Sequence, residues 1–109
     1  MCAEISDTGL LRLLDGCQHL STLGLEGCER LTDLSVERMA SCPQLRALNL
    51  ARCRLLTDAG VRALLPLCRR HVLVELNVSQ CAVTRESVRM FTAAGCAIVS
   101  SVAAHAGVE

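Results

Sequence analysis

Residues 42–64 read CPQLRALNLARCRLLTDAGVRAL, and this stretch decides the fold. Its first half has leucines at positions 45, 48 and 50, in the order L-x-x-L-x-L, and then a cysteine at position 53. Its second half begins with Thr57-Asp58 and continues with apolar residues at helical spacing. Alternating leucines indicate a strand with one buried face, and a Thr-Asp pair is typical of the start of a helix. The stretch therefore predicts one strand followed by one helix.

The same pattern recurs on both sides of this stretch. Leucine or valine takes the L-x-x-L-x-L positions again at residues 20–25 and 73–78, and the helical half recurs at residues 31–39 and 83–91. A further helical half runs from Ile5 to Leu13, with apolar positions at Leu10 and Leu13. The spacing of 25 residues between Cys28 and Cys53, and of 28 between Cys53 and Cys81, marks an array of repeated strand–helix units.

The repeat predicts a single α/β domain of stacked units. Full units are expected at Cys17–Ala40, Cys42–Leu65 and Cys68–Thr92, with a partial unit at each end. Strands are expected near residues 21–25, 46–50, 74–78 and 100–104, and helices near 7–16, 33–41, 58–68 and 85–94. The extra residues of the longer period fall around Pro66 to Val72, where we expect a loop. This architecture is a leucine-rich-repeat solenoid, an arc with parallel strands on the concave face and helices on the convex face.

The composition narrows the class of protein. Eleven basic residues, all of them arginine, balance eleven acidic ones, and Phe91 is the only aromatic residue. Nucleic-acid binding is disfavoured, because the net charge is zero and no Tyr or Trp is available for stacking on bases. The sequence has no apolar run long enough to span a membrane and no pattern of a secretory signal, so we expect no membrane partner and an intracellular location, cytoplasm or nucleus.

The eight cysteines are predicted to be repeat positions. A buried cysteine behaves as a small apolar residue with a weak hydrogen-bond donor, which suits a tight turn. Disulfides or zinc sites are the alternatives for so many cysteines, but no close C-x-x-C pairs are present. We therefore expect no metal and no cofactor. One cysteine precedes each helical half and another opens each strand half: Cys2, Cys28, Cys53 and Cys81, and Cys17, Cys42, Cys68 and Cys96.

These residues resemble the cysteine-containing leucine-rich repeats of F-box proteins, whose pattern is close to C-x-x-L-x-x-L-x-L-x-x-C-x-x-L-T-D-x-x-L. Cys17 to Val36 and Cys42 to Val61 match it almost position for position, and the resemblance extends from Cys2 to about Ala104. It implies repeats that hold a protein, peptide or small ligand on the concave face. In that family the F-box recruits an adaptor of an SCF ubiquitin ligase, and these residues leave no room for an F-box. Arg85 departs from the pattern, because it replaces the aspartate at the helix start.

The first repeat cysteine, Cys2, has no strand half before it. The edge of the strand at residues 21–25 is therefore expected to be uncovered, and open edges invite pairing with another chain. The hypothesis is that these residues are the C-terminal part of a longer array, or that this end docks onto a partner.

The candidate binding surface is the row of side chains that face solvent from the strands and the turns after them. Columns across the sheet combine the residues Thr22, Ala47, Glu75 and Ser101, and next to them Gly24, Asn49, Asn77 and Ala103. The polar middle of this surface could hold a polar or acidic peptide segment; the alternative is a solvated face with no dedicated ligand. The predicted partner-binding residues are Arg46, Asn49, Arg52, Glu75, Asn77 and Gln80.

Catalysis finds no support in the sequence. No Ser/His/acid or Cys/His set stands at motif spacing, and His19, His71 and His105 fall in different repeats. The sequence therefore predicts a non-enzymatic protein-interaction module resembling the substrate-recognition region of F-box proteins. The alternative is a structural subunit packed within a large assembly.

Overall fold

The computed structural model describes residues 6–16 and 19–100. Four short parallel strands form one sheet in the order β1-β2-β3-β4, so strands that follow one another in the chain are neighbours in the sheet. Each position pairs with its repeat equivalent, as Leu23 does with Leu48 and Leu48 with Leu76. The strands are β1 (Thr22–Gly24), β2 (Ala47–Asn49), β3 (Glu75–Asn77) and β4 (Ala97–Val99). Sequential parallel strands are what the predicted stacking of units requires.

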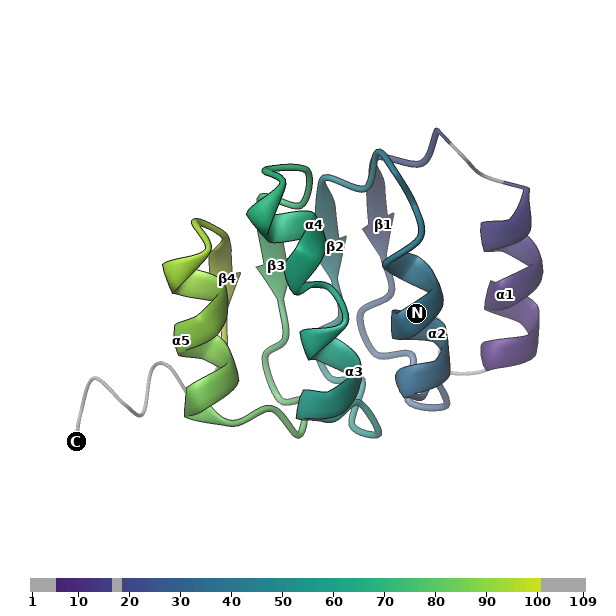
Figure 1. Cartoon of the computed structure of the whole chain (residues 1–109). Coiled ribbons are helices and arrows are strands. Elements are labelled where there is room, and N and C mark those ends of the chain that lie inside the picture. Colours follow the sequence, from purple (N-terminus) through teal and green to yellow (C-terminus); the bar gives the residue numbers. More distant parts are fainter. Residues whose placement is uncertain (1–5, 17–18, 101–109) are drawn as a thin grey trace.

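The helices form a second layer along one side of the sheet (Figure 1). They are α1 (Asp7–Asp15), α2 (Asp33–Met39), α3 (Asp58–Arg62), α4 (Leu65–Arg69) and α5 (Arg85–Ala93). Four of them start at the residue that the repeat predicts, after Ser6, Thr32, Thr57 and Thr84 as N-caps. Among the residues described, no helix is long and apolar enough to cross a membrane.

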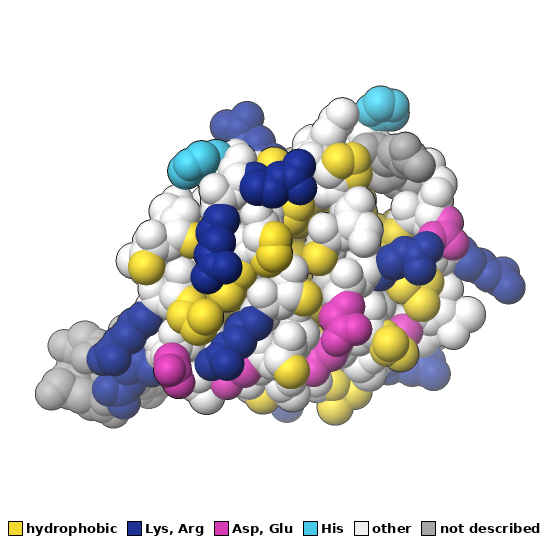
Figure 2. Space-filling model, viewed as in Figure 1, with side chains coloured by type: hydrophobic (Ala, Val, Ile, Leu, Met, Phe, Trp, Pro, Cys, Tyr) yellow, Lys and Arg dark blue, Asp and Glu magenta, His cyan; other side chains and the backbone are white. Residues whose placement is uncertain are grey.

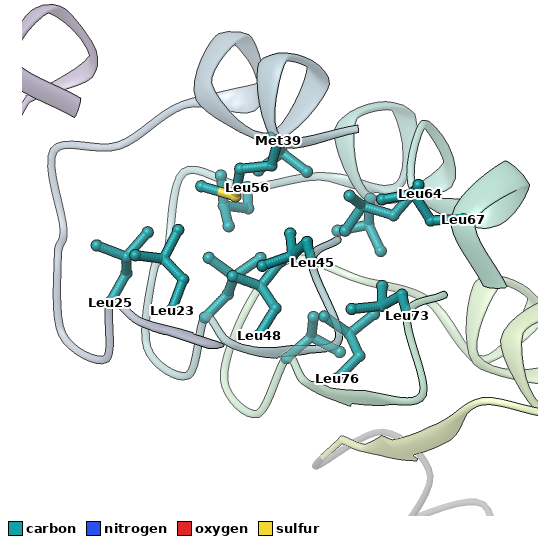
Figure 3. Packing of buried hydrophobic residues seen from close by; sticks show 14 of the residues in the cluster. Leu23, Leu25, Met39, Leu45, Leu48, Leu56, Leu64, Leu67, Leu73 and Leu76 are labelled. Atoms are coloured by element: carbon teal, nitrogen blue, oxygen red, sulfur yellow. The ribbon is translucent and has the colours of Figure 1, made fainter. Parts of the chain in front are cut away.

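The core lies between the two layers. The inward leucines of β1, β2 and β3 lie side by side, and Met39 and Leu64 reach them from the helix layer (Figure 3). Leu45, Leu56 and Leu64 have no exposed surface at all. Burial of a leucine side chain contributes about 1.5–3 kcal/mol to the stability of the fold. The repeated layers of leucine therefore provide the stabilisation that a large core with aromatic residues provides in other domains. The predicted alternation of inward leucines is thus confirmed.

The fourth strand lies earlier than the predicted residues 100–104, of which 101–104 are outside the described residues. β4 lies at Ala97–Val99, where Ile98 is the partner of Leu76 and Ala97 that of Glu75. The shift arises because α5 ends close to the strand: the N–H of Cys96 donates to the carbonyl of Phe91, and only Gly95, with φ of 89°, turns the chain. The loop before β2 is longer, so the spacing from cysteine to strand does not carry over. The expected column residues Ser101 and Ala103 lie outside the described residues.

The single helix predicted at residues 58–68 was wrong. The chain forms α3 and α4, separated at Ala63 and Leu64. In a continuous helix Pro66 would donate to the carbonyl of Arg62, and proline has no N–H to do so. Pro66 instead lies in the first turn of α4, where the missing donor costs little. The extra residues of this unit are therefore largely helical rather than the expected loop.

One apolar position was misassigned in α1. Leu13 is 48% exposed, whereas Leu10 and Leu14 are buried. Residues three or four positions apart in a helix lie on the same face. In α1 the buried pair is Leu10 and Leu14, four positions apart, and Leu13 is left at the surface. Of the other predicted apolar positions, Leu10 is confirmed, and Ile5 lies outside the described residues.

Neighbouring units are joined at the helix starts by aspartates. The carboxylate of Asp7 accepts from the backbone N–H of Thr32 at 2.9 Å, from its hydroxyl at 2.5 Å, and from the Ser35 hydroxyl at 2.5 Å. Asp33 accepts the same two bonds from Thr57, at 2.9 and 2.5 Å. Each aspartate thus satisfies donors at the start of the next helix, which helices otherwise leave unpaired. These contacts keep the units in the register that aligns the strands.

Candidate protein-binding groove

The outward side chains of all four strands line one shallow groove of about 450 Å³. We call it the strand groove. The leucines at the centres of β1, β2 and β3 also line the groove. Their side chains point into the core, so it is their backbone that forms part of the floor. The outward residues that line it are Thr22, Gly24, Ala47, Asn49, Glu75, Asn77, Ala97 and Val99.

Small side chains leave the space that makes the groove. Gly24, Ala47 and Ala97 occupy outward positions on three different strands, so little fills the face above the sheet. Val99 on β4 also lines the groove, and it is 56% exposed although its side chain is apolar. The hollow therefore offers an apolar, solvent-accessible platform interrupted by a few polar groups, as ligand sites usually do.

The structure brings three of the six predicted partner-binding residues together. Asn49, Glu75 and Asn77 line the strand groove, on the adjacent strands β2 and β3. Arg46 is exposed but precedes β2 and is not among the groove-lining residues; its carbonyl accepts from the N–H groups of Val74 and Glu75. Its backbone therefore sets the register of β3, whereas its side chain lies apart from the groove.

Arg52 and Gln80 lie in the turns that follow β2 and β3 rather than in the groove. Both have left-handed backbone conformations, with φ of 64° and 59°, at the repeat position where Gly27 has φ of 79°. Arg52 also makes an exposed ion pair with Glu26, at 3.0 Å. The sequence predicted that both residues belong to the polar middle of the binding surface, but the turns place them outside the groove lining.

Asn49 and Asn77 have equivalent local roles. The side-chain oxygen of Asn49 accepts the backbone N–H of Ala51 at 3.0 Å, and that of Asn77 accepts the N–H of Ser79 at 3.0 Å. Such bonds two residues along the chain stabilise the turn after each strand. Since the oxygens are engaged, the carboxamide nitrogens remain as donors beside the groove.

Sequence reasoning missed Ala97 and Val99 as groove residues, because it placed β4 too late. In the sequence Ala97, Ile98 and Val99 are all apolar, so no period of two marks them, and the alternation of exposed and half-buried residues is visible only in the structure. The connection before β4 is shorter than expected. Ala97 and Val99 therefore take the column positions that the sequence assigned to Ser101 and Ala103.

The described cysteines take the repeat positions expected of them. Cys28, Cys42, Cys53, Cys68 and Cys96 are buried, Cys81 is partly buried, and all six are thiols rather than disulfides. The Cys53 thiol donates to the carbonyl of Leu25 at 3.2 Å, and the Cys81 thiol to that of Leu50 at 2.9 Å. Each bond joins one unit to the strand of the unit before it. Cys2 and Cys17 lie outside the described residues.

The environments of Cys81 and Cys68 do not favour thiolate chemistry, whereas a hydrogen bond with Cys68 lowers the pKa of Cys96 despite its burial. Burial raises the pKa of Cys81, although the N–H groups of Cys53 and Arg52 oppose it. A hydrogen bond with Cys96, together with burial, raises the pKa of Cys68. Protonated thiols are poor nucleophiles and poor metal ligands. Within residues 6–16 and 19–100, no group of three or more His, Cys, Asp or Glu side chains is placed to hold a metal ion.

Residues 41–65 match the family model described as Leucine Rich repeat. The matched segment begins just before Cys42 and ends at Leu65, so it spans β2, its turn and α3. This is the unit from which the sequence analysis started, and the match confirms it as a leucine-rich repeat. Leucine-rich repeats generally mediate protein–protein interaction and are typically not enzymes.

Proposed function

We propose that this chain is a non-enzymatic protein-interaction module whose strand groove receives an extended segment of a partner protein. The observation that carries the proposal is the groove itself, which takes lining residues from all four strands. Adjacent strands lie about 4.8 Å apart, so the groove spans about 14 Å from β1 to β4. That length accommodates about four residues of an extended peptide.

The composition of the two faces supports this assignment. Arginine side chains and a few acidic ones are spread over the face formed by the helices, with apolar side chains exposed between them (Figure 2). The strand groove is different, since glycine, alanine and threonine occupy half of its outward positions. An extended peptide requires a surface that its backbone can approach closely, and small residues provide one.

Stacked leucine-rich units with this sheet order form, in our proposal, an arc whose concave side is the strand groove. Within that architecture the proposed class is the substrate-recognition region of an F-box protein of an SCF ubiquitin ligase, acting in ubiquitin-dependent degradation. The burial of Cys53 and the bond from its thiol to the preceding strand support the cysteine-containing subclass. Recruitment of the ligase would belong to residues outside this chain.

The second candidate function is that of a structural leucine-rich-repeat subunit in a large assembly, with no role in ubiquitination. Exposed leucines on the helix side favour it: Leu34 is 62% exposed and Leu55, before α3, is 54% exposed. Apolar side chains on the side away from the groove would then pack against neighbouring subunits.

A displayed library of random 12-residue peptides tests the groove. We expect selected peptides to bind the full chain and to lose at least tenfold in affinity when Ala47→Trp fills the groove. Ala59→Trp, on the exposed face of α3, is the matched control and should leave binding unchanged. Peptides that bind both variants equally would contradict a role for the groove.

Purification of the protein from its own cells distinguishes the two cellular roles. Co-purification of an SCF adaptor supports the ligase assignment. A complex of fixed stoichiometry that lacks the adaptor supports the structural subunit instead.

A further inference from the structure

We infer that the strand groove selects a partner segment carrying a basic side chain, arginine or lysine, which pairs with Glu75. The inference rests on the proposed function, because it names the chemistry of the segment that the groove receives. It departs from the polar or acidic segment that the sequence suggested as one possible ligand.

Among the described residues that line the groove, Glu75 is the one with a charged side chain. It is the first residue of β3, the third strand of the sheet, and it is exposed. Within the described part of the chain its carboxylate takes part in no ion pair. A lone carboxylate above an apolar platform attracts cations more strongly than it would in open water, because low-dielectric surroundings weaken screening.

The neighbours of Glu75 leave room for a long side chain. Its register partners are Ala47 on β2 and Ala97 on β4, and both line the groove. Arginine and lysine carry apolar stems that pack on such surfaces while the charged end reaches a polar partner. The alanines would contact the stem and Glu75 the cationic group. A planar guanidinium can make two parallel bonds to a carboxylate, so arginine fits best.

The two asparagines complete the recognition surface. Asn49 and Asn77 are register partners one strand apart, and their side-chain oxygens are held by turn bonds. Their NH₂ groups are therefore the available ends, and they donate to carbonyl oxygens of a peptide backbone. Backbone contacts give affinity without dependence on sequence, whereas Glu75 gives the preference for a cation.

An acidic segment fits the groove less well. The arginines that would attract it are displaced: Arg52 is in the turn after β2, paired with Glu26, and Arg46 precedes β2 and is absent from the lining. An acidic side chain in the groove would face Glu75 without a cation beside it, and like charges in proximity repel.

The experiment selects random 12-residue peptides on the full chain and on two variants, Glu75→Gln and Glu75→Arg. We expect arginine or lysine at one enriched position of the wild-type peptides. We expect those peptides to bind Glu75→Gln about three- to tenfold more weakly, and more weakly at higher salt in the wild type. Glu75→Arg should select peptides with aspartate or glutamate at that position. Glu29→Gln, a charge removal at an exposed residue outside the groove, is the control.

The outcomes separate the inference from the proposed function. One outcome would overturn the inference and leave the groove as the binding site. In it, Ala47→Trp abolishes peptide binding, the selected peptides show no basic enrichment, and Glu75→Gln leaves their affinity unchanged. Acidic enrichment in the wild type would overturn it as well. Peptides insensitive to Ala47→Trp would overturn the proposed function, and with it the inference.

Discussion

Two junctions between neighbouring units have an aspartate at the same repeat position but in different surroundings. At the junction of α1 and α2, the carboxylate of Asp7 accepts from Thr32 and from the Ser35 hydroxyl. At the junction of α2 and α3, Asp33 accepts from Thr57, and the position equivalent to Ser35 is Gly60. A Cβ atom on Gly60 would lie 2.2 Å from the nearer oxygen of Asp33. The first junction therefore has an additional hydrogen-bond donor, the Ser35 hydroxyl, and the second has room for the Asp33 side chain at Gly60.

The difference shows that a repeat position is defined by its contact with the neighbouring unit. Ser35 is fully buried and needs an acceptor, which Asp7 provides. Gly60 is buried too, but it allows the whole side chain of Asp33 to lie against the backbone of α3. Serine and glycine are both poor helix formers, so their place in a helix start reflects the junction and not helix propensity.

The largest expected effect comes from filling the space at Gly60. Gly60→Val would force Asp33 away from Thr57, because Cβ, Cγ and Oδ1 of Asp33 all lie within 2.7 Å of the added Cβ. We expect a loss of about 3 kcal/mol in the free energy of unfolding, from overpacking together with the lost bonds to Thr57. Urea unfolding followed by circular dichroism measures it.

Gly9 in α1 is the matched control for that substitution. Nothing lies within 4 Å of a Cβ atom added there. Gly9→Val should change stability by less than about 0.5 kcal/mol, since valine and glycine differ little in helix propensity. Equal losses at the two glycines would show that the close approach of Asp33 is not what Gly60 serves.

The aspartates themselves sharpen the comparison. Asp7→Ala removes the acceptor of three donors, one of them on the fully buried Ser35, and should cost about 2 kcal/mol. Asp33→Ala removes the acceptor of two donors on the exposed Thr57, which water can replace, and should cost about 1 kcal/mol. Urea midpoints with unchanged slopes give both values. A larger loss at Asp33 would reverse the interpretation of the junctions.

Stability should also fall in acid because of these junctions. Burial would raise the pKa of Asp7, but hydrogen bonds from Ser35 and Thr32 outweigh it and lower the pKa below its ordinary value of 3.8. For Asp58 burial is likewise outweighed, by bonds from Thr84 and Ser87, and its pKa is lowered. A lowered pKa in the folded state stabilises the fold above the unfolded value, and the contribution is lost as the pH falls through the folded value.

The measurement is the urea midpoint between pH 6 and pH 2.5. We expect the wild type to lose stability once the pH falls below about 4, and the gap between wild type and Asp7→Asn to shrink over the same range. A gap that stays constant as the pH falls would contradict the lowered pKa of Asp7.

Much of the fold could be predicted from the sequence because its signals are local. Alternating leucines place β1, β2 and β3 correctly, and the Ser-Asp and Thr-Asp pairs place three helix starts to the residue. The role of the aspartates was not found, because a Thr-Asp pair already has a local explanation as a helix cap. Only the Thr32 side chain caps its own helix, by accepting the N–H of Leu34 at 3.3 Å. Asp7 and Thr32 are 25 residues apart, and the repeat period alone brings them together.

The candidate site was half predictable for a related reason. Asn49, Glu75 and Asn77 are outward strand positions, which a period of two identifies. Arg52 and Gln80 follow the strands, where the chain turns with positive φ. The alternation of inward and outward side chains that holds in a strand does not continue through such a turn. The shift of β4 depends on the short connection after α5, a property of one unit that the repeat average conceals.

The smallest expected effect is at the other end of the α1–α2 junction. Arg38 in α2 forms an ion pair and hydrogen bond with Asp15 in α1, and both side chains are more than half exposed. Exposed pairs contribute about 0–1 kcal/mol because water screens the charges and two flexible side chains must be held in place. We expect Arg38→Ala to cost less than about 0.5 kcal/mol, and the cost to vanish in 0.5 M salt. A loss as large as that of Asp7→Ala would mean that surface charge, and not the acceptor at the helix start, holds α1 against α2.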